Sequence, residues 1–304
     1  MVPLLLRSFL HQSSKEVVGL RGLRLITNAT TQTALSDIIV DPTPTKNRND
    51  DSPAIGLSLI GRPGSGKGTY GTLLAKAFGC PLIIVGDVLR DHVHRNTEIG
   101  KEISVFQKEG RLADDNLVAK ALISHLEKLI SQSDDNVKFR FILDGFPRSL
   151  PQAKLMFPSA SDSNECSKNT ILWPKRYQIS FAVNIDVPDQ ICIEKMLGRR
   201  KCKVCHDNFN VTDVNKNNFV MPPKLPIPYP CQKCDMEEDW ERRLDDTETI
   251  MRRRLEEFHT TSSPVESFFE DRGKLLTFQP FRGVLDMPKM KDLVIRHARE
   301  LVET

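Results

Sequence analysis

Residues 61–69 constrain this chain more than any other segment, because they spell Gly-Arg-Pro-Gly-Ser-Gly-Lys-Gly-Thr between a predicted strand and a predicted helix. An apolar run over 54–60 precedes them, and helical periodicity follows over 69–78 before Gly79. Glycines at this spacing let the backbone curl so that N–H groups face phosphate oxygens, and the helix N-terminus adds positive partial charge. Lys67 supplies a mobile cation. The segment therefore predicts a phosphate-binding loop rather than an ordinary glycine-rich turn.

The loop has one unusual position. Gly68 follows the lysine where many such loops place a Ser or Thr for Mg²⁺, and the hydroxyl comes one residue later. This form resembles the loop of the nucleoside monophosphate kinases. The residues predicted to hold phosphate are Gly64, Ser65, Gly66, Lys67, Gly68 and Thr69.

The rest of the chain alternates apolar strand patterns with helical patterns, which predicts an α/β fold with a mostly parallel, doubly wound sheet. The expected strands are 54–60, 81–85, 139–143, 179–185 and 274–278. The expected helices are 69–78, 88–95, 98–109, 115–130, 189–197, 246–258 and 290–302, with Gly86-Asp87 as a break. Residues 159–176 are predicted to be a polar surface insertion, and 201–241 a small Cys- and Pro-rich subdomain.

A second motif, Asp144-Gly145-Phe146-Pro147-Arg148, ends the third expected strand. Open α/β sheets bind ligands at the carboxyl ends of their strands, where an Asp can organise Mg²⁺ and an Arg can bind phosphate. Alone, an Asp at a strand end is as often a turn former. Together with the loop at 61–69, the motif closely resembles the adenylate kinase family. The resemblance runs in order from about residue 55 to 300.

The resemblance implies a kinase domain over 53–304, with a helical AMP-binding insertion at 86–118 and a lid at 199–242. It implies Mg²⁺ bound with ATP, and Asp144 organising that ion. Asp245 and Asp246 would lock the lid. The implied catalytic cations are Lys67, Arg148, Arg199, Arg243 and Arg254. Further implied nucleotide-binding positions are Asp87, Arg90, Gly145, Gln152 and Lys195, of which Gln152 would read the adenine of AMP.

Three positions depart from the family pattern. Val85 stands where the family usually has Thr or Ser, so a hydroxyl near the AMP base is lost. Lys195 stands where an arginine usually packs on the ATP adenine, and a lysine stacks less well. The Glu-Thr pair after the two aspartates comes one residue earlier than in the family pattern. Arg253 is therefore the alternative to Arg254 as the arginine that follows the lid. Apart from that alternative, Arg252 and Arg253 are interpreted as solvated helix-face residues.

Four cysteines form two Cys-x-x-Cys knuckles in the predicted lid. This spacing predicts a closed tetrahedral Zn²⁺ site, against the alternatives of unligated thiols or redox pairs. A nucleic-acid-binding ribbon is disfavoured because the aromatic residues are scattered and the segment after the last cysteine is acidic. The candidate ligands are Cys202, Cys205, Cys231 and Cys234. Cys80 and Cys192 are expected in the core.

The N-terminal segment differs from the rest in composition. Residues 1–36 contain four Lys or Arg and one acid, so they account for the whole net charge of +3. Together with the Leu, Ser and Thr content, this predicts a transit peptide, mitochondrial in the first place and chloroplastic as the alternative. Residues 37–52 are expected to be a linker. The neutral remainder argues against a polyanion partner, and no apolar run approaches the roughly 18 residues of a membrane span.

The predicted function is reversible transfer of a phosphoryl group from Mg·ATP to AMP by a monomer. A GTP-dependent AMP kinase or another nucleoside monophosphate kinase is the nearest alternative, since Lys195 leaves the donor base open. A nucleotide-binding regulator without turnover is the alternative from another class, and the complete arginine set argues against it. A motor ATPase is disfavoured because Gly145 follows Asp144, which leaves no adjacent acid to activate water.

Overall fold

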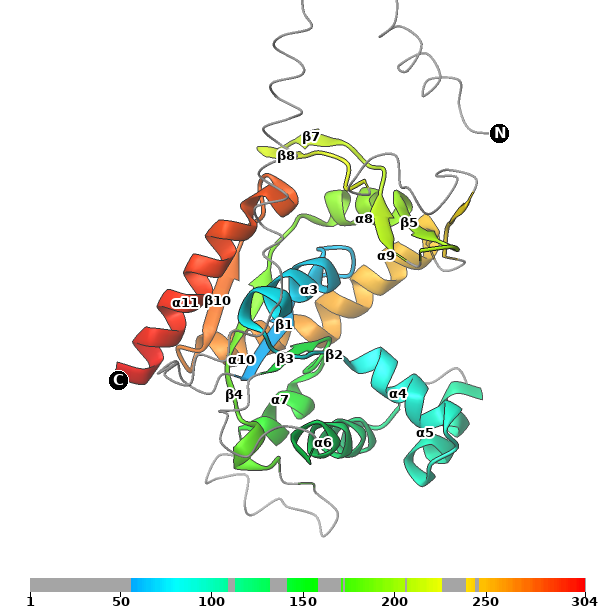
Figure 1. Cartoon of the computed structure of the whole chain (residues 1–304), viewed down its shortest axis with the longest axis vertical. Coiled ribbons are helices and arrows are strands. Elements are labelled where there is room, and N and C mark those ends of the chain that lie inside the picture. The colour runs from blue at the N-terminus through cyan, green and yellow to red at the C-terminus, as the bar shows by residue number, and fades with distance from the viewer. Residues whose placement is uncertain are drawn as a thin grey trace, which may run out of the picture. The chain divides into compact units, whose positions relative to one another are not determined.

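The computed structural model describes residues 56–108, 113–131, 141–157, 171, 173–205, 207–225, 239–243 and 246–303 (Figure 1). The predicted transit peptide and linker lie outside these residues, and so do Cys231, Cys234 and Asp245. Within the described ranges, no helix is long and apolar enough to cross a membrane.

A five-stranded parallel sheet forms the centre, with the strand order β10-β4-β1-β3-β2. This confirms the predicted doubly wound parallel sheet. In the register of β1 with β3, Leu59 pairs with Asp144, so the loop after β1 and the end of β3 meet at one edge. The strands are β1 (Gly56–Ile60), β2 (Leu82–Ile84), β3 (Phe141–Asp144), β4 (Ile179–Ile185) and β10 (Leu275–Phe278).

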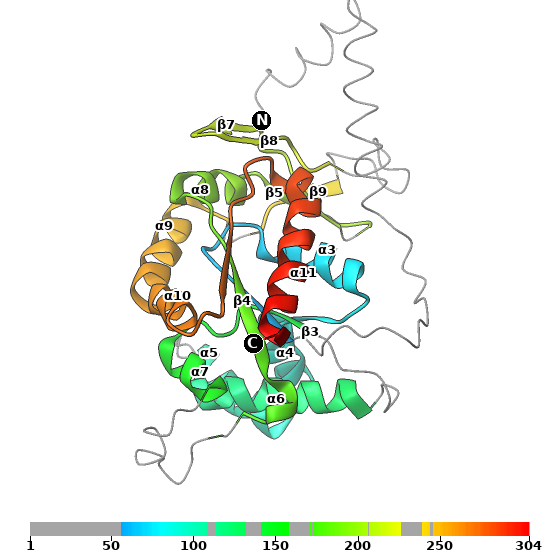
Figure 2. The ribbon, with the colours of Figure 1, turned by 90° about the vertical axis from the view of Figure 1, so that its left-hand side faces the viewer.

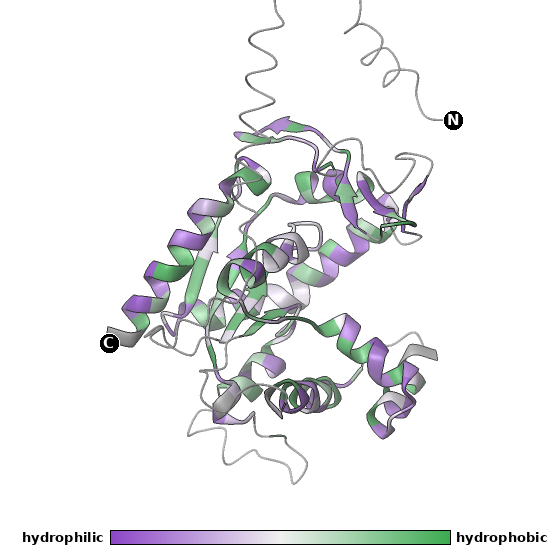
Figure 3. Cartoon of the chain, in the orientation of Figure 1, coloured by the Kyte–Doolittle hydropathy of each residue, from purple (hydrophilic) through white to green (hydrophobic). Residues whose placement is uncertain are grey.

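Helices cover both faces of the sheet (Figure 2). On one face lie α8 (Asp189–Leu197), α9 (Glu248–Glu257) and α10 (Ser263–Glu270), and on the other α3 (Lys67–Phe78) and α11 (Met287–Glu303). In α11 the buried residues recur at helical spacing, as Figure 3 shows by its hydrophobic and hydrophilic sides. These residues are Met287, Met290, Val294 and Ala298.

Beyond the β2 edge lie α4 (Val85–His94), α5 (Glu98–Lys108) and α6 (Asp115–Ser131); the insertion predicted at 86–118 covers nearly all of α4, all of α5 and only the start of α6. The expected break at Gly86-Asp87 is wrong, because the chain passes from β2 directly into α4. Gly86 and Asp87 lie in the first helical turn, where an acid complements the helix dipole and a glycine interrupts few helical hydrogen bonds. Asp87 and Arg90 therefore lie one turn apart on a single helix.

Two helices and one core aromatic were not predicted. Helix α7 (Leu150–Met156) begins at Ser149, whose hydroxyl accepts the N–H of Gln152 at 3.3 Å, and α10 begins with a proline in its first turn. Trp173 belongs to the predicted surface insertion, yet it is buried and stacks on Phe146 with 5.5 Å between ring centroids. The part of that insertion described here thus contributes to the core.

The described part of the lid is a small antiparallel structure. Strands β6 (Asn208–Asn210), β5 (Arg199–Cys202) and β9 (Trp240–Glu241) form one sheet in that order, and β7 (Val214–Lys216) pairs with β8 (Phe219–Met221). The β7–β8 hairpin also contacts the segment before α11, because Val220 N–H donates to the Phe281 carbonyl at 2.7 Å.

Candidate active site

The phosphate-binding loop joins β1 to α3 as the sequence predicts. Gly66 precedes α3 with φ of 100°, a left-handed conformation that favours glycine, and no side chain caps the helix. Its first N–H groups are thus available to an anion. The Ser65 hydroxyl is fully buried and has no hydrogen-bond partner among the described atoms. A buried orphan hydroxyl beside an uncapped helix start fits a loop that binds phosphate.

Lys67 lies at the centre of the loop. Its Nζ donates to the carbonyl oxygens of Gly61 at 2.6 Å and Arg62 at 2.8 Å. Burial lowers the pKa of Lys67 to about 8, although the nearby carboxylate of Asp144 opposes the shift. The lysine is therefore a partly desolvated cation held by main-chain oxygens, and an arriving phosphate supplies the anion that it lacks.

Asp144, Arg148 and Arg254 complete a charged cluster around Lys67. Desolvation raises the pKa of Asp144, while the charges of Lys67 and Arg148 oppose the rise. Arg254 is close enough to depress the pKa of both Lys67 and Arg148, each of which is lowered mainly by desolvation. Four predicted site residues from the loop, β3 and α9 are thus brought together. Such a constellation of one acid and three cations suits a polyphosphate.

The Asp144 carboxylate faces the unusual glycine of the loop, since a Cβ added to Gly68 would lie 3.5 Å from Asp144 Oδ2. In the described ranges, no group of three or more His, Cys, Asp or Glu side chains is close enough to form a metal site. Mg²⁺ is usually held by one or two carboxylates together with water and nucleotide phosphates, and Asp144 can supply one such carboxylate.

Arg148 is fixed through its neighbours. Its Nε donates to the Gly145 carbonyl at 2.9 Å, and its own carbonyl accepts the Ser262 hydroxyl at 2.8 Å. Ser262 belongs to η5 (Phe258–Ser262), a π-helical turn that joins α9 to α10. Sequence reasoning missed this turn, and π-turns inside helices are frequent at functional sites.

The predicted AMP contacts lie on α4 and α7. Arg90 pairs with Asp87 on α4, and both side chains are more than half exposed. Gln152 is buried, and its amide is engaged within the protein: Oε1 accepts the Arg148 N–H at 2.7 Å, and Nε2 donates to Asp115 at 2.6 Å. In this structure Gln152 therefore orients the loop that carries Arg148.

The lid arginines make contacts of their own. Arg199 binds Asp246 through two hydrogen bonds of 2.9 and 2.5 Å, and the Asp246 side chain is fully buried. Arg243 is exposed, with Nη2 3.5 Å from Asn208 Oδ1. The Arg199–Asp246 pair agrees with the lid-locking role implied for Asp246.

Lys195 projects from α8 toward the β7–β8 hairpin, where its Nζ lies 3.5 Å from the sulfur of Met221. Burial lowers the pKa of Lys195, and Lys224 acts in the same direction. A thioether is a weak acceptor. The ammonium group thus has spare hydrogen-bonding capacity toward a ligand.

Half of the predicted zinc site is described. Cys202 is buried, and its sulfur accepts the N–H groups of Val204 and Cys205, both at 3.4 Å. Backbone N–H groups around a cysteine sulfur stabilise a thiolate, which is the form that binds a metal. The local geometry of this knuckle therefore fits a metal ligand pair, and the second pair lies outside the described residues.

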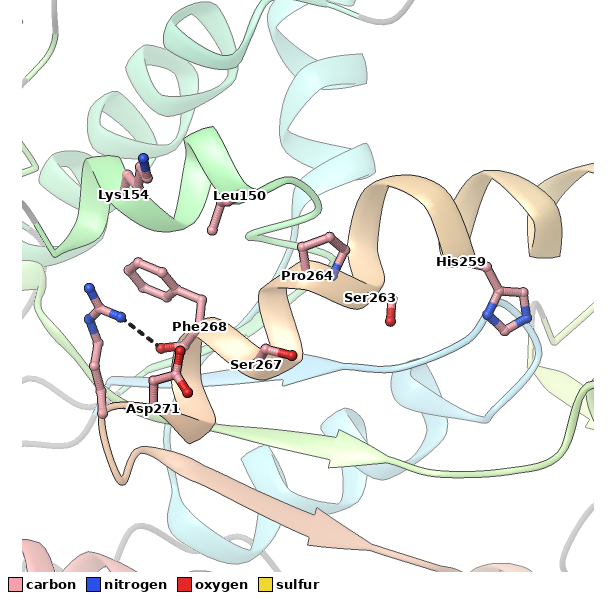
Figure 4. Close-up of a pocket in the computed structure, with 9 residues that line it drawn as sticks. Leu150, Lys154, His259, Ser263, Pro264, Ser267, Phe268 and Asp271 are labelled. Carbon is pink, nitrogen blue, oxygen red and sulfur yellow. Dashed lines mark hydrogen bonds between the residues drawn. The ribbon is translucent and has the colours of Figure 1, made fainter.

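A surface groove of about 610 Å³ lies elsewhere, between α7 and the η5–α10 segment (Figure 4). Its lining includes Leu150, Lys154, His259 and Phe268, and Arg272 stacks on Phe268 at 3.6 Å from the ring centroid. No residue predicted from the sequence to bind nucleotide lines it. The charged cluster at the end of β1 and β3 is therefore the candidate site.

Comparisons with known proteins cover the same region. A family model described as adenylate kinase matches residues 59–274. The chain is 32% identical to a GTP:AMP phosphotransferase of Plasmodium falciparum over 245 residues, which cover 80% of this chain and 97% of that protein. It is 33% identical to an adenylate kinase of Caldicellulosiruptor saccharolyticus over 233 residues, covering 77% and 95%. It is 31% identical to "Adenylate kinase 1, chloroplastic" of Arabidopsis thaliana over 232 residues, covering 74% and 72%.

Proposed function

Since the chain belongs to the adenylate kinase family of phosphotransferases, we propose that it transfers the terminal phosphoryl group of Mg·ATP reversibly to AMP, giving two ADP. The observation that carries this proposal is the convergence of Lys67, Asp144, Arg148 and Arg254 at the carboxyl edge of the parallel sheet. Phosphoryl transfer needs two nucleotides held in line and cations around the moving group, and little covalent help from protein.

The residues have distinct roles in this mechanism. The N–H groups of the loop and of the first turn of α3 bind the donor phosphates, and Lys67, held by its two carbonyl acceptors, directs its remaining N–H at the outer phosphates. Arg148 and Arg254 stabilise the negative charge spread over the transferred group. Asp144 would hold Mg²⁺, which neutralises phosphate charge when bound. Closure of the lid excludes water, and lid opening limits turnover.

The direct test is phosphoryl transfer by the purified full chain, with ATP or GTP as donor, AMP, UMP or CMP as acceptor, and Mg²⁺ present. We expect ADP formation from ATP and AMP, with the pyrimidine nucleotides more than tenfold poorer acceptors. Transfer to UMP or CMP at similar rates would contradict AMP as the acceptor. Nucleotide binding without any transfer would favour a regulatory protein instead.

A second candidate donor is GTP, favoured by Lys195 and by the name of the Plasmodium relative. Guanine presents the O6 acceptor where adenine presents an amino donor, so an ammonium group beside the donor base favours guanine. We expect Lys195→Met to lower the ratio of kcat/KM for GTP to that for ATP about tenfold, because a hydrogen bond from a charged donor is lost. Lys291→Met, at an exposed position on α11, is the control. An unchanged ratio in Lys195→Met would remove Lys195 from donor selection.

The donor step should also depend on pH through Lys67. This lysine carries its charge below about pH 8 and loses it above, since burial lowers its pKa to about 8. We therefore expect kcat/KM for the donor to fall above pH 8, approaching about tenfold per pH unit. The measurement is a profile from pH 6.5 to 10 in the wild type and in Lys67→Arg, in which the charge persists. A flat wild-type profile to pH 9.5 would contradict the assignment.

We also propose that the four lid cysteines bind one structural Zn²⁺, supported by the N–H groups directed at the Cys202 sulfur. Metal analysis of the full chain should give about one zinc per chain, with loss of the metal in Cys202→Ser and retention in Cys80→Ser. A metal-free wild type with four titratable lid thiols would contradict this proposal.

For the location we propose import into an organelle directed by residues 1–36, and the name of the Arabidopsis relative favours the chloroplast over the mitochondrion. The test is the destination of a fluorescent protein carrying residues 1–52 at its N-terminus. Accumulation in mitochondria would support the mitochondrial interpretation of the arginine pattern, and a diffuse cytosolic signal would contradict both.

A further inference from the structure

Arg62, the second residue of the phosphate-binding loop, is held by two carboxylates from distant parts of the chain. Its Nη1 lies 2.6 Å from Asp186 Oδ1, and its Nε lies 2.8 Å from Asp189 Oδ1. Asp186 follows β4 and Asp189 begins α8. The arginine side chain is 24% exposed, so this guanidinium is less solvated than those of ordinary surface pairs.

Both carboxylates have second partners that fix them in place. Asp186 Oδ2 accepts the Gln279 side-chain amide at 2.8 Å, and Asp189 Oδ2 lies 2.8 Å from His259 Nε2. The ring of Phe258 also faces the guanidinium, with 6.0 Å between the ring centroid and the Arg62 Cζ. Phe258 and His259 both belong to the π-helical turn η5. The guanidinium is therefore contacted from three segments, the residues after β4, the start of α8 and η5, rather than by one flexible neighbour.

The main chain of the same residue supports the catalytic lysine. The Arg62 carbonyl accepts Lys67 Nζ at 2.8 Å and the Ser65 N–H at 3.1 Å, and the adjacent Gly61 carbonyl accepts Lys67 Nζ at 2.6 Å. Side chain and carbonyl share one Cα, so holding the guanidinium restricts where this carbonyl can lie. The placement of the ammonium group of Lys67 thus depends on the two ion pairs of Arg62.

The contacts of the Arg62 side chain also involve the helices next to the lid. Helix α8 runs into β5, the first lid strand, and α9 follows the last lid strand before reaching η5. The two helices pack against each other on one face of the sheet (Figure 2). Arg62 contacts the start of α8 through Asp189 and the end of α9 through Phe258.

We propose that Arg62 is a positioning residue for the phosphoryl donor: anchored by Asp186 and Asp189, it places Lys67 through its carbonyl oxygen and ties the loop to both helices that carry the lid. The proposal rests on the phosphotransferase function above. An exposed ion pair would contribute little, whereas this guanidinium is largely enclosed, hydrogen-bonded to Asp186 and paired by charge with Asp189.

The test compares full-chain Arg62→Met, which keeps the aliphatic contact and removes the charge, with the wild type in the ATP and AMP assay. We expect kcat/KM for the donor to fall about tenfold, with the donor KM raised about fivefold and the KM for AMP within twofold of the wild type. In a folded variant, a lower kcat with an unchanged donor KM, a rise in both KM values, or unchanged donor kinetics would each overturn the proposal.

Three further variants keep the result interpretable. Arg95→Met removes a more exposed arginine ion pair on α4, with Asp91, and should leave the donor KM unchanged. Arg62→Lys should have a donor KM between those of the wild type and Arg62→Met. If circular dichroism shows that Arg62→Met is not folded, Arg62→Lys takes its place in the test. In a double-mutant cycle with Asp189→Asn, the effects on the donor KM should be less than additive, whereas additive effects would contradict the coupling.

An inactive wild type would refute the proposed function instead of the role of Arg62, and this result is seen before any variant is made.

Discussion

Replacing Lys67 with Met is expected to lower kcat/KM for phosphoryl transfer by about a thousandfold, because a preorganised cation at the transferred group contributes most of the stabilisation that the protein supplies. The ammonium group lies between two loop carbonyls, close to Asp144 and Arg148, so no solvent ion can occupy its place with the same geometry. The measurement is ADP formation from ATP and AMP by the full chain at saturating Mg²⁺. Circular dichroism reports whether the variant is folded.

The loss of activity should not come with a loss of stability. Burial disfavours the charged form of Lys67, so an unbranched apolar side chain of similar length removes a desolvated charge and is expected to keep the melting temperature or raise it. Lys76→Met, in the last turn of the same helix, is the matched control and should stay within twofold of the wild type. A fully active Lys67→Met protein would contradict the assignment of the loop.

Much of the fold was predictable because its signals are local. The three inner strands β1, β3 and β4 are buried apolar runs, and the edge strands β2 and β10 are short apolar runs that are partly exposed. Such runs are visible in the sequence whatever their neighbours are. The loop at 61–69 fixes β1 and α3 on either side of it. The strand order that brings Asp144 beside the end of β1 was not predicted, because the motifs indicated only that both segments lie at the carboxyl ends of strands.

The elements that were predicted wrongly or missed depend mostly on contacts between segments far apart in the sequence. The helix α4 contains Gly86, a poor helix former, and its formation depends on packing of Val85 and Val88 into the core. Trp173 sits in a polar stretch, and its burial depends on stacking with Phe146 far away in sequence. Helix α7 carried a usable signal, Ser149 followed three residues later by a glutamine, which is a capping-box pattern.

The site shows the same limit. Sequence pattern identifies Lys67 and Asp144, because each lies in a short motif whose chemistry is specific. It does not reveal that Arg62 pairs with Asp186, which is 124 residues away. It also does not reveal that the amide of Gln152, which is predicted to read the base of AMP, bonds to Asp115 and to the main chain of Arg148. Contacts between distant segments depend on the tertiary fold.

The arginine at the end of the lid is the second large effect that we expect. Arg254→Ala should lower kcat for ATP and AMP by about a hundredfold or more, because its charge acts on both Lys67 and Arg148 at the candidate site. Arg253→Ala should stay within twofold. Adjacent helix positions point about 100° apart, and Arg253 faces outward with Glu248, Thr249, Arg252 and Glu256.

The pair of variants tests the choice that the sequence left open, with each serving as the control for the other. Both replace an arginine on α9 by the best helix former, so helix propensity and net charge change equally. Any difference in rate then reports which guanidinium reaches the transferred phosphoryl group. A hundredfold loss in Arg253→Ala with an active Arg254→Ala would reverse the assignment. Equal losses in both variants would mean that α9 contributes through its overall charge, since long-range attraction of nucleotides depends on the number of charges. Losses of that kind would become smaller at high salt.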